Sequence, residues 1–571
     1  MLRKQLCEII ANSILLQTNL EPVPEDVIQV IRINYCRAAL ILLLTILVWR
    51  PISAQTPVSK VWVADNGDGT YRNPIIHADY SDPDVVRVGR DFYLVASSFN
   101  AAPGLPILQS QDLVNWTIIG HALSRQPPFD VFARPQHGNG VWAPAIRYHN
   151  GEFYIFYPDP DFGIYLVKAK DPAGPWSEPR LIKEAKGWID PCPFWDDDGK
   201  AYLVSAFARS RSGIKSLLVI SRMSEDGTKL LDEGAMVFDG HANDPTVEGP
   251  KLHKRNGFYY IFAPAGGVET GWQLALRSKN IYGPYERRVV LAQGKTNING
   301  PHQGAWVETQ SGESWFIHFQ DKGAYGRIVH LEPMNWVNDW PVIGSDPDGD
   351  GTGEPVSKFK KPNVVGNIPR ATPIDTDEFN ADRLGLQWQW QANPQTNWAL
   401  PSAAYGLLRL FNIPPASGSR NFWDVPNLLL QKFPAPAFTA TTKINFTARN
   451  DGESAGLIVT GTDYAYVSVK KQQDGLYVSQ TVCVSADKGA AEIETPGIKL
   501  NQTSFWLRVK VDENASVNFS FSTDGTSFTS IGKPFKARAG RWIGSKVGIF
   551  AVSARPNSEM GYADFDWFRV E

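Results

Sequence analysis

Cysteine is scarce in this chain, which contains four among 571 residues. Cys7 and Cys36 lie in an N-terminal region that we expect to be removed, and Cys192 and Cys483 fall in different predicted domains. A disulfide framework is therefore not expected to hold the fold together. CxxC and HExxH motifs are also missing, so no sequence motif suggests a zinc site.

An excess of charge of either sign is missing as well. The formal net charge is −3, which favours neither nucleic acid nor an anionic membrane as a partner. Apolar residues at helical spacing are few, whereas 48 glycines, 41 prolines and 12% aromatic residues are present. This composition is typical of an all-β protein rich in turns, and the chain is too long for one hydrophobic core.

The N-terminal region contains one apolar run, AALILLLTILVW at 38–49, which follows Arg37. Twelve residues are too few to span a bilayer comfortably, and small residues near Ala54 and Gln55 offer a cleavage site. We predict that residues 1–55 are a targeting segment with a signal peptide and that the protein is exported to the periplasm or beyond, with no lasting membrane span. An uncleaved anchor is the alternative, and the 35 residues before the run are long enough to suggest a start site assigned too far upstream.

A short strand signature recurs five times between residues 89 and 321, with a turn on one side and an aromatic residue in its middle. The aligned aromatics, about 48 to 61 residues apart, are Tyr93, Tyr154, Tyr202, Tyr260 and Phe316. Strand repeats at this spacing indicate a radial array of sheets, and five copies predict a five-bladed β-propeller.

Beyond the repeats the pattern changes to alternating strands. Phe505, Leu507, Val509 and Val511 fall on one face, and STDGTS at 522–527 predicts a turn. We therefore predict a propeller at 56–345, a Gly/Pro/Asp-rich linker at 346–371 and a β-sandwich of the jelly-roll kind at 372–571.

Polar residues next to proline precede four of the aligned aromatics by 11 to 14 residues. They are Asp82, Asp190, Glu248 and His302. If the aromatics mark the second strand of each blade, these residues lie on the first strands, which line the central channel. Two carboxyl groups across a channel suit glycosidic cleavage, because one donates a proton while the other attacks or activates water, and a third can raise the pKa of the acid.

Four segments around these residues resemble glycoside hydrolase family 43. They are HADYSDPDVVRVGRDFYLVASSF at 77–99, NGVWAPAIRYHNGEFYIFY at 139–157, GWIDPCPFWDDDGKAYLV at 187–204 and TVEGPKLHKRNGFYYIFA at 246–263. The resemblance implies a five-bladed propeller that inverts configuration and removes pentose, as β-xylosidases and α-L-arabinofuranosidases do. It also implies that Asp82 is the general base, Glu248 the general acid, and Asp190 the residue that tunes that acid. Inversion implies that base and acid carboxyls stand about 6.5–9.5 Å apart.

Four further positions match substrate-contacting residues of that family. Arg327 in YGRIVHLEP would contact sugar hydroxyls near the base, and Trp142 in VWAP would form a wall of the pocket, as would Phe99 in SSF. His302 in GPHQG matches a channel histidine that lies near a bound cation in some members, and a purely structural role is the alternative.

The chain departs from the family pattern in two places. Ala101-Ala102 replaces a bulky pair found in many xylosidases, which predicts a more open pocket rim, and Ala145 stands where an aspartate is frequent. Both changes disfavour a simple β-xylosidase and fit an arabinofuranosidase or a branched substrate.

The C-terminal region resembles the concanavalin-like domain that follows the propeller in many members. The resemblance implies that this domain can bind a structural calcium and lend a loop to the active site, with Glu378 and Asp566 as candidate calcium ligands. Asp346, Asp348 and Asp350 resemble the start of a calcium loop, but Ser357 stands at its twelfth position, so we interpret them as a turn.

The leading hypothesis is an exported glycosidase, requiring no cofactor for its chemistry, that releases terminal α-L-arabinofuranose or β-D-xylose from plant cell-wall oligo- or polysaccharides. A non-catalytic carbohydrate-binding propeller with a lectin-like sandwich is the alternative, and a structural propeller leaves the aligned acids unexplained. A propeller glycosidase acting on fructans fits the surrounding motifs less well.

Overall fold

The computed structural model describes residues 58–555 and 559–571. The expected targeting segment 1–55 and its cleavage site lie outside the described residues. Within the described part, none of the helices combines the length and the apolar character needed to cross a bilayer. Nearly every described element is a strand, as the composition predicts.

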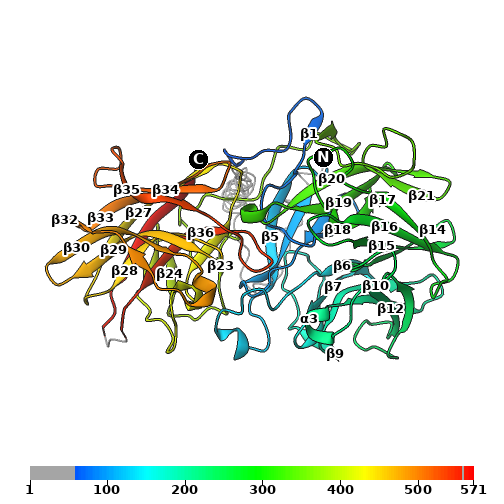
Figure 1. Ribbon diagram of the computed structural model, residues 1–571, viewed down its shortest axis with the longest axis horizontal. Coiled ribbons are helices and arrows are strands. Elements are labelled where there is room, and N and C mark those ends of the chain that lie inside the picture. The colour runs from blue at the N-terminus through cyan, green and yellow to red at the C-terminus, as the bar shows by residue number, and fades with distance from the viewer. Residues whose placement is uncertain (1–57, 556–558) are drawn as a thin grey trace, which may run out of the picture. The chain divides into compact units, whose positions relative to one another are not determined.

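Five four-stranded antiparallel sheets follow one another along the chain, and Figure 1 colours them from blue to green. Blade I holds β2 (Asp84–Val88), β3 (Asp91–Val95), β4 (Gly104–Ser110) and β5 (Trp116–Leu123). Blade II holds β6 (Ala145–His149), β7 (Glu152–Asp159), β8 (Gly163–Ala169) and β9 (Arg180–Glu184). Blade III holds β10 (Trp188–Trp195), β11 (Ala201–Phe207), β12 (Leu217–Met223) and β13 (Ala235–Asp239). Blade IV holds β14 (Lys251–Arg255), β15 (Phe258–Ala265), β16 (Trp272–Ser278) and β17 (Glu286–Leu291), and blade V holds β18 (His302–Glu308), β19 (Ser314–Asp321), β20 (Arg327–Val337) and β21 (Trp340–Ile343).

The five aligned aromatics all lie on the second strand of a blade, which confirms the repeat as a propeller. All five side chains are buried, and they pack between neighbouring blades. Tyr93 packs with Phe153 of blade II, and Tyr260 and Phe316 share one cluster between blades IV and V. The repeated aromatic is thus the side chain that fills the space between sheets.

The ring closes between its last and first blades. Leu94 and Val85 of blade I share a core with Ile317 and Val329 of blade V. The chain that precedes blade I strengthens this closure, because Ile76 forms a backbone bridge with Val329. Among the described strands, none of one blade enters the sheet of another, so side-chain packing between blades, together with this bridge, closes the ring.

The C-terminal domain is a sandwich of two antiparallel sheets, coloured yellow to red in Figure 1. One sheet has the order β23-β26-β36-β28-β29-β30-β31, with β32 paired to β30; its strands are β23 (Gln389–Trp390), β26 (Leu429–Lys432), β28 (Ser454–Thr460), β29 (Tyr464–Gln472), β30 (Gly475–Cys483), β31 (Ile493–Glu494), β32 (Ile498–Leu500) and β36 (Lys546–Val552). The other has the order β24-β25-β37-β27-β33-β34-β35, comprising β24 (Ala399–Ser402), β25 (Leu407–Phe411), β27 (Phe438–Thr447), β33 (Ser504–Val511), β34 (Ser516–Ser522), β35 (Thr529–Lys536) and β37 (Tyr562–Val570). Phe505, Leu507, Val509 and Val511 all face the core between the sheets, as their alternation predicts.

The segment between the two domains is tied to the start of the propeller. Within 346–371, β22 (Lys358–Lys360) pairs with β1 (Thr70–Arg72) in a two-stranded sheet. The short helices are α3 (Arg209–Ser212), η1 (Val131–Ala133), η2 (Gly323–Tyr325), η3 (Phe422–Asp424) and η4 (Ala486–Lys488). Cys192 and Cys483, the two cysteines in the described residues, are both buried and free.

One buried ion pair links the first three blades. The Asp84 carboxylate of blade I accepts a hydrogen bond from Arg147 Nη1 of blade II at 2.7 Å and another from the Ile146 backbone N–H at 2.8 Å. Arg147 Nη2 also donates to Cys192 Sγ in blade III at 2.9 Å. The side chains of Asp84 and Arg147 are 0% and 15% exposed, so loss of either charge leaves the other buried without compensation.

We expect Asp84→Asn to lower the free energy of unfolding by about 3–5 kcal/mol, because the Arg147 charge would remain buried without its partner. Urea unfolding followed by tryptophan fluorescence measures the change. Lys60→Met is the control, since it removes an ion pair between side chains that are 71% and 65% exposed, and it should have little effect. Equal effects of the two substitutions would contradict the assignment.

Candidate active site

The seven residues that the sequence singles out all line one cavity of about 290 Å³. Each blade contributes at least one of them. They are Asp82, Phe99, Trp142, Asp190, Glu248, His302 and Arg327. Such a convergence places three carboxyl groups, one guanidinium, one imidazole and two aromatic rings around a single space.

The polar residues lie at the starts of the first strands rather than along them. Asp82 precedes β2 by two residues, Glu248 precedes β14 by three, and His302 is the first residue of β18. Only Asp190 lies inside its strand, β10, at a position where the pairing with β11 shifts. The sequence predicts that the polar residues lie on the first strands. In the structure they lie at or just before the beginning of those strands, next to the cavity.

The backbone at these positions is locally strained. Asp82 has φ 54° and Asp190 has φ 55°, values that L-residues seldom adopt. Gly249, which follows Glu248, has φ 59°, and a Cβ there would lie 2.4 Å from Gln303 Cγ. Glycine is therefore needed beside Glu248, and the turned backbone aims the acidic side chains at one cavity.

Asp82 is held by three hydrogen-bond donors. Its Oδ2 accepts from Ser97 Oγ at 2.6 Å and from Ser81 Oγ at 2.9 Å, and its Oδ1 accepts from Arg327 Nη1 at 2.9 Å. Both members of the Asp82–Arg327 ion pair are buried, with side chains 6% and 8% exposed. The carboxylate is thus fixed in orientation and faces the cavity as an acceptor.

Asp190 and Glu248 are interacting carboxyl groups on neighbouring blades. Asp190 Oδ2 accepts from the Gly249 backbone N–H at 2.7 Å, which ties the two residues together. Burial, and then the charge of Glu248, raise the pKa of Asp190 well above its ordinary value. The Asp190–Glu248 pair therefore retains one proton at pH values where an exposed aspartate is ionised, and the Glu248 side chain, 30% exposed, faces the cavity.

His302 lies beside Glu248. Its Nε2 is 3.3 Å from Glu248 Oε1, and the imidazole is buried against Phe319. From the sequence, His302 could have either a binding role or a purely structural role. In the structure it lines the cavity, and its imidazole lies next to the carboxyl group of the predicted acid, Glu248.

The structure adds to the cavity an aromatic side chain, Trp542, that the sequence alone does not identify. Trp542 lies between β35 and β36 of the sandwich and lines the cavity with the propeller residues. Its ring centroid is 6.2 Å from that of Trp142, and the Arg327 guanidinium carbon is 5.7 Å from it. The resemblance predicts a loop from this domain, but no spacing rule identifies which of its residues reaches a site more than two hundred positions away.

Basic residues also line the cavity and have no motif in the sequence. Arg209, the first residue of α3, and Lys215, which follows that helix, belong to its lining. Lys251 lies deeper, 1% exposed, and its Nζ donates to the Pro144 carbonyl at 3.0 Å.

The prediction of a more open rim at Ala101-Ala102 is wrong. Both alanines are buried, and neither lines the cavity. The Ala102 N–H and carbonyl pair with the backbone of Trp390 at 3.1 and 2.6 Å, so strand β23 of the sandwich covers this segment. Ala145 is likewise fully buried, in a core that includes Trp142.

The candidate calcium ligands already have protein partners. Glu378 receives two hydrogen bonds from Arg569, and Asp566 pairs with Lys443. Asp346, Asp348 and Asp350 accept backbone N–H bonds within 346–352, which fits the interpretation as a turn. These contacts compete with a cation for the same oxygens.

The fold and the site together define a carbohydrate-cleaving propeller enzyme, and comparison with known proteins agrees. The model of glycosyl hydrolases family 43 matches residues 71–341, and that of the β-xylosidase C-terminal concanavalin A-like domain matches residues 376–571. The chain belongs to glycoside hydrolase family 43 and is a glycoside hydrolase of the xylosidase/arabinofuranosidase kind, whose chemistry needs no cofactor.

Relatives span nearly the whole described chain. A "Putative beta-xylosidase" of Xylanibacter ruminicola is 43% identical over 502 residues, covering 86% of this chain and 88% of that protein. A "Non-reducing end alpha-L-arabinofuranosidase" of Bacteroides ovatus is 30% identical over 533 residues, covering 87% and 94%. The crystal structure of a xylan β-1,4-xylosidase from Bacillus halodurans superposes with a TM-score of 0.77 at 25% identity, covering 88% of this chain and 99% of that one.

We expect Trp542→Ala to lower kcat/KM on a nitrophenyl pentoside about tenfold, equivalent to about 1.4 kcal/mol. The reason is loss of an aromatic wall that can pack against a sugar face. Steady-state kinetics provide the measurement. Tyr405→Ala, which removes an aromatic side chain 81% exposed in the same domain, is the control. Unchanged kinetics in Trp542→Ala would exclude this residue from the site.

Proposed function

We propose that the enzyme releases a terminal pentose, α-L-arabinofuranose or β-D-xylose, from plant cell-wall oligo- or polysaccharides with inversion of configuration. The observation that carries this proposal is the set of three carboxyl groups, from blades I, III and IV, that line one cavity in unlike environments. Asp82 is an ion-paired acceptor, whereas Asp190 keeps a raised pKa beside Glu248. Unlike environments for paired carboxyls are what acid and base roles require.

In the proposed reaction Asp82 takes a proton from water as the water oxygen forms a bond to the anomeric carbon. The bond from that carbon to the glycosidic oxygen breaks, and Glu248 donates its proton to the departing oxygen. Asp190 orients Glu248 and disfavours a second negative charge beside it. Arg327, Trp142, Phe99 and His302 would contact the sugar.

The cavity size supports a small terminal unit. A volume of about 290 Å³ is at the low end for ligand pockets, which suits a single sugar residue better than a long chain segment. The relatives named β-xylosidase and α-L-arabinofuranosidase favour a pentose for this chain too. A paired assay with nitrophenyl α-L-arabinofuranoside and β-D-xyloside, then branched oligosaccharides, distinguishes the two sugars.

Export is also part of the proposal, supported by the apolar run at 38–49 and the small residues that follow it. N-terminal sequencing of protein recovered outside the inner membrane tests the cut near residue 55. A structural calcium is not assigned to Glu378 or Asp566, because Arg569 and Lys443 already compensate their charges.

Asp82→Asn and Glu248→Gln should each lower kcat by at least about a hundredfold, because each removes one proton-transfer group. Hydrolysis of nitrophenyl pentosides gives the rates, and NMR of fresh product identifies the anomer. Asp171→Asn is the control: this residue also precedes a proline, but its Oδ1 accepts the Ala173 N–H in an exposed turn. Full activity in both variants would refute the assignment, and a retained anomer would refute the role of Asp82 in activating water.

Asp190→Asn should move the basic limb of the pH profile of kcat/KM to lower pH. The sign follows from the coupling, since mutual repulsion between Asp190 and Glu248 holds a proton in the site, and removal of one charge lets that proton leave at lower pH. Rates measured from pH 4 to 9 test the shift. An unmoved basic limb with a reduced kcat would mean that Asp190 acts through geometry alone.

A further inference from the structure

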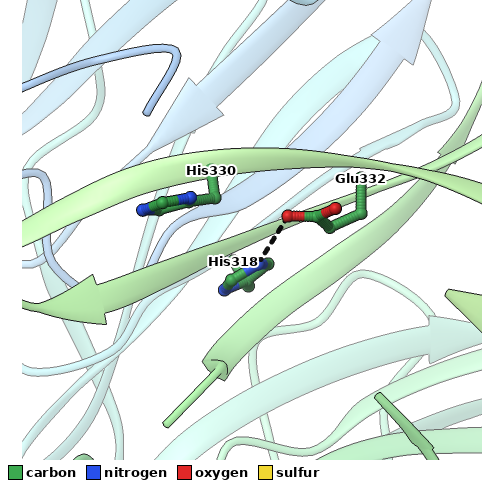
Figure 2. A group of neighbouring side chains, drawn as sticks. All are labelled: His318, His330 and Glu332. Atoms are coloured by element: carbon green, nitrogen blue, oxygen red, sulfur yellow. Dashed lines mark hydrogen bonds and ion pairs between the residues drawn. The ribbon is translucent and has the colours of Figure 1, made fainter. Parts of the chain in front are cut away.

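Two histidines and a glutamate meet in blade V, outside the cavity. His318 lies on β19, and His330 and Glu332 lie on β20 (Figure 2). None of the three lines the active-site cavity, and each is at most 1% exposed. One ligating atom from each residue lies within 4.8 Å of the others.

The strand register explains this meeting. His318 pairs directly with His330 across the antiparallel β19–β20 ladder, and Glu332 follows His330 by two residues. Side chains at such positions share one face of a sheet. Three metal-ligating groups therefore come together from sequence positions 318, 330 and 332, a spacing that no helical or CxxC-type motif describes.

The hydrogen bonds of His318 leave its second ring nitrogen, Nε2, facing another hydrogen-bond acceptor. Its Nδ1 is 3.0 Å from the Phe319 carbonyl oxygen, which can only accept, so Nδ1 carries a proton. In the neutral imidazole Nε2 then presents a lone pair, yet it faces Glu332 Oε1 at 3.2 Å, as the dashed line in Figure 2 marks. Two acceptors at this distance need a proton or a metal cation between them.

His330 is buried without compensation. Neither of its ring nitrogens has a hydrogen-bond partner among the described residues. The imidazole is 1% exposed, and its ring centroid lies 5.3 Å from that of His318, so a neutral His330 ring would offer a lone pair beside the His318–Glu332 contact. An unsatisfied buried polar group costs about 1–3 kcal/mol, which coordination of one nitrogen would offset.

Glu332 lacks a basic partner. Within the described residues no lysine or arginine forms an ion pair with it, and His318 alone lies within ion-pair distance. Its Oε2 accepts the Val356 N–H at 2.8 Å, which orients the carboxylate, and its Oε1 faces His318 Nε2 at 3.2 Å while also accepting a long hydrogen bond from Asn73 Nδ2 at 3.4 Å. Metal ligands in proteins usually make a second hydrogen bond that fixes their orientation. Glu332 makes one through Oε2, and His318 makes one through Nδ1 to the Phe319 carbonyl.

We propose that His318, His330 and Glu332 bind one divalent transition metal of the zinc class as a structural site. The 3.2 Å between His318 Nε2 and Glu332 Oε1 is close to the edge of a zinc tetrahedron, about 3.3 Å for bonds of about 2.0–2.1 Å. Two imidazoles and one carboxylate suit zinc, whereas calcium takes oxygen ligands.

The bound metal would cross-link β19 to β20 in the blade that carries His302 and Arg327. Because all three ligands are buried, metal uptake accompanies folding rather than following it. This inference does not depend on the proposed sugar specificity, and its test needs no substrate.

The test is the metal content of the full chain, produced without a histidine tag in zinc-supplemented medium. Elemental analysis should find about one zinc per chain, and protein produced with cobalt should show the visible absorption of a nitrogen- and oxygen-ligated Co²⁺. His330→Gln should lower zinc content at least roughly tenfold. Added calcium should not displace the metal.

His253→Gln is the matched control, because His253 is a half-buried histidine whose buried Nε2 is also unpartnered, but it belongs to no group of metal-ligating side chains among the described residues. The His253→Gln protein should retain its zinc even if the substitution lowers the stability of the fold. Metal-free wild-type protein with no cobalt spectrum would overturn the proposal and assign a shared proton to the His318–Glu332 contact. Equal zinc content in the wild type and His330→Gln would also overturn it.

Discussion

The buried ion pair between Arg327 and Asp82 is the contact on which the site depends. It joins the last blade to the neighbouring first blade in the lining of the cavity. The same arginine is fixed through its backbone, because its N–H donates to Asp79 Oδ1 at 2.9 Å, while Asp79 Oδ2 accepts the Gly544 N–H at 2.9 Å. Gly544 belongs to the loop that carries Trp542, so one short network connects the ring closure, a catalytic carboxylate and the wall contributed by the sandwich.

A second constraint is the strained backbone around the cavity. Left-handed conformations at Asp82 and Asp190 cost free energy that regular strands would not. Interblade packing supplies the rigidity that holds them, since apolar clusters occupy every interface from blade I to blade V and back to blade I. The free energy gained by packing between blades thus offsets the cost of the strained backbone that carries the acidic residues near the axis.

Much of the fold could be predicted because the propeller is a repeat. Tyr93 and its four counterparts occur at intervals that one blade requires, and alternation at Phe505 and Leu507 follows directly from strand geometry. The three acids could be predicted for the same reason, since each precedes its aligned aromatic by 11 or 12 residues. Ala101 and Ala102 show the limit of this reasoning, because a strand from the other domain covers them and no local pattern in their own blade reveals it.

The sequence by itself determined the number of blades, the change to a sandwich and the residues that approach the axis, because these depend on short-range periodicity and repeat spacing. Only the tertiary structure decided which partners those residues meet. The Asp190–Gly249 bond, the approach of Trp542 to Trp142 and the meeting of His318 with Glu332 depend on strand register and domain contacts. Such contacts join positions whose separation along the chain carries no signal, since they arise only when sheets and domains pack.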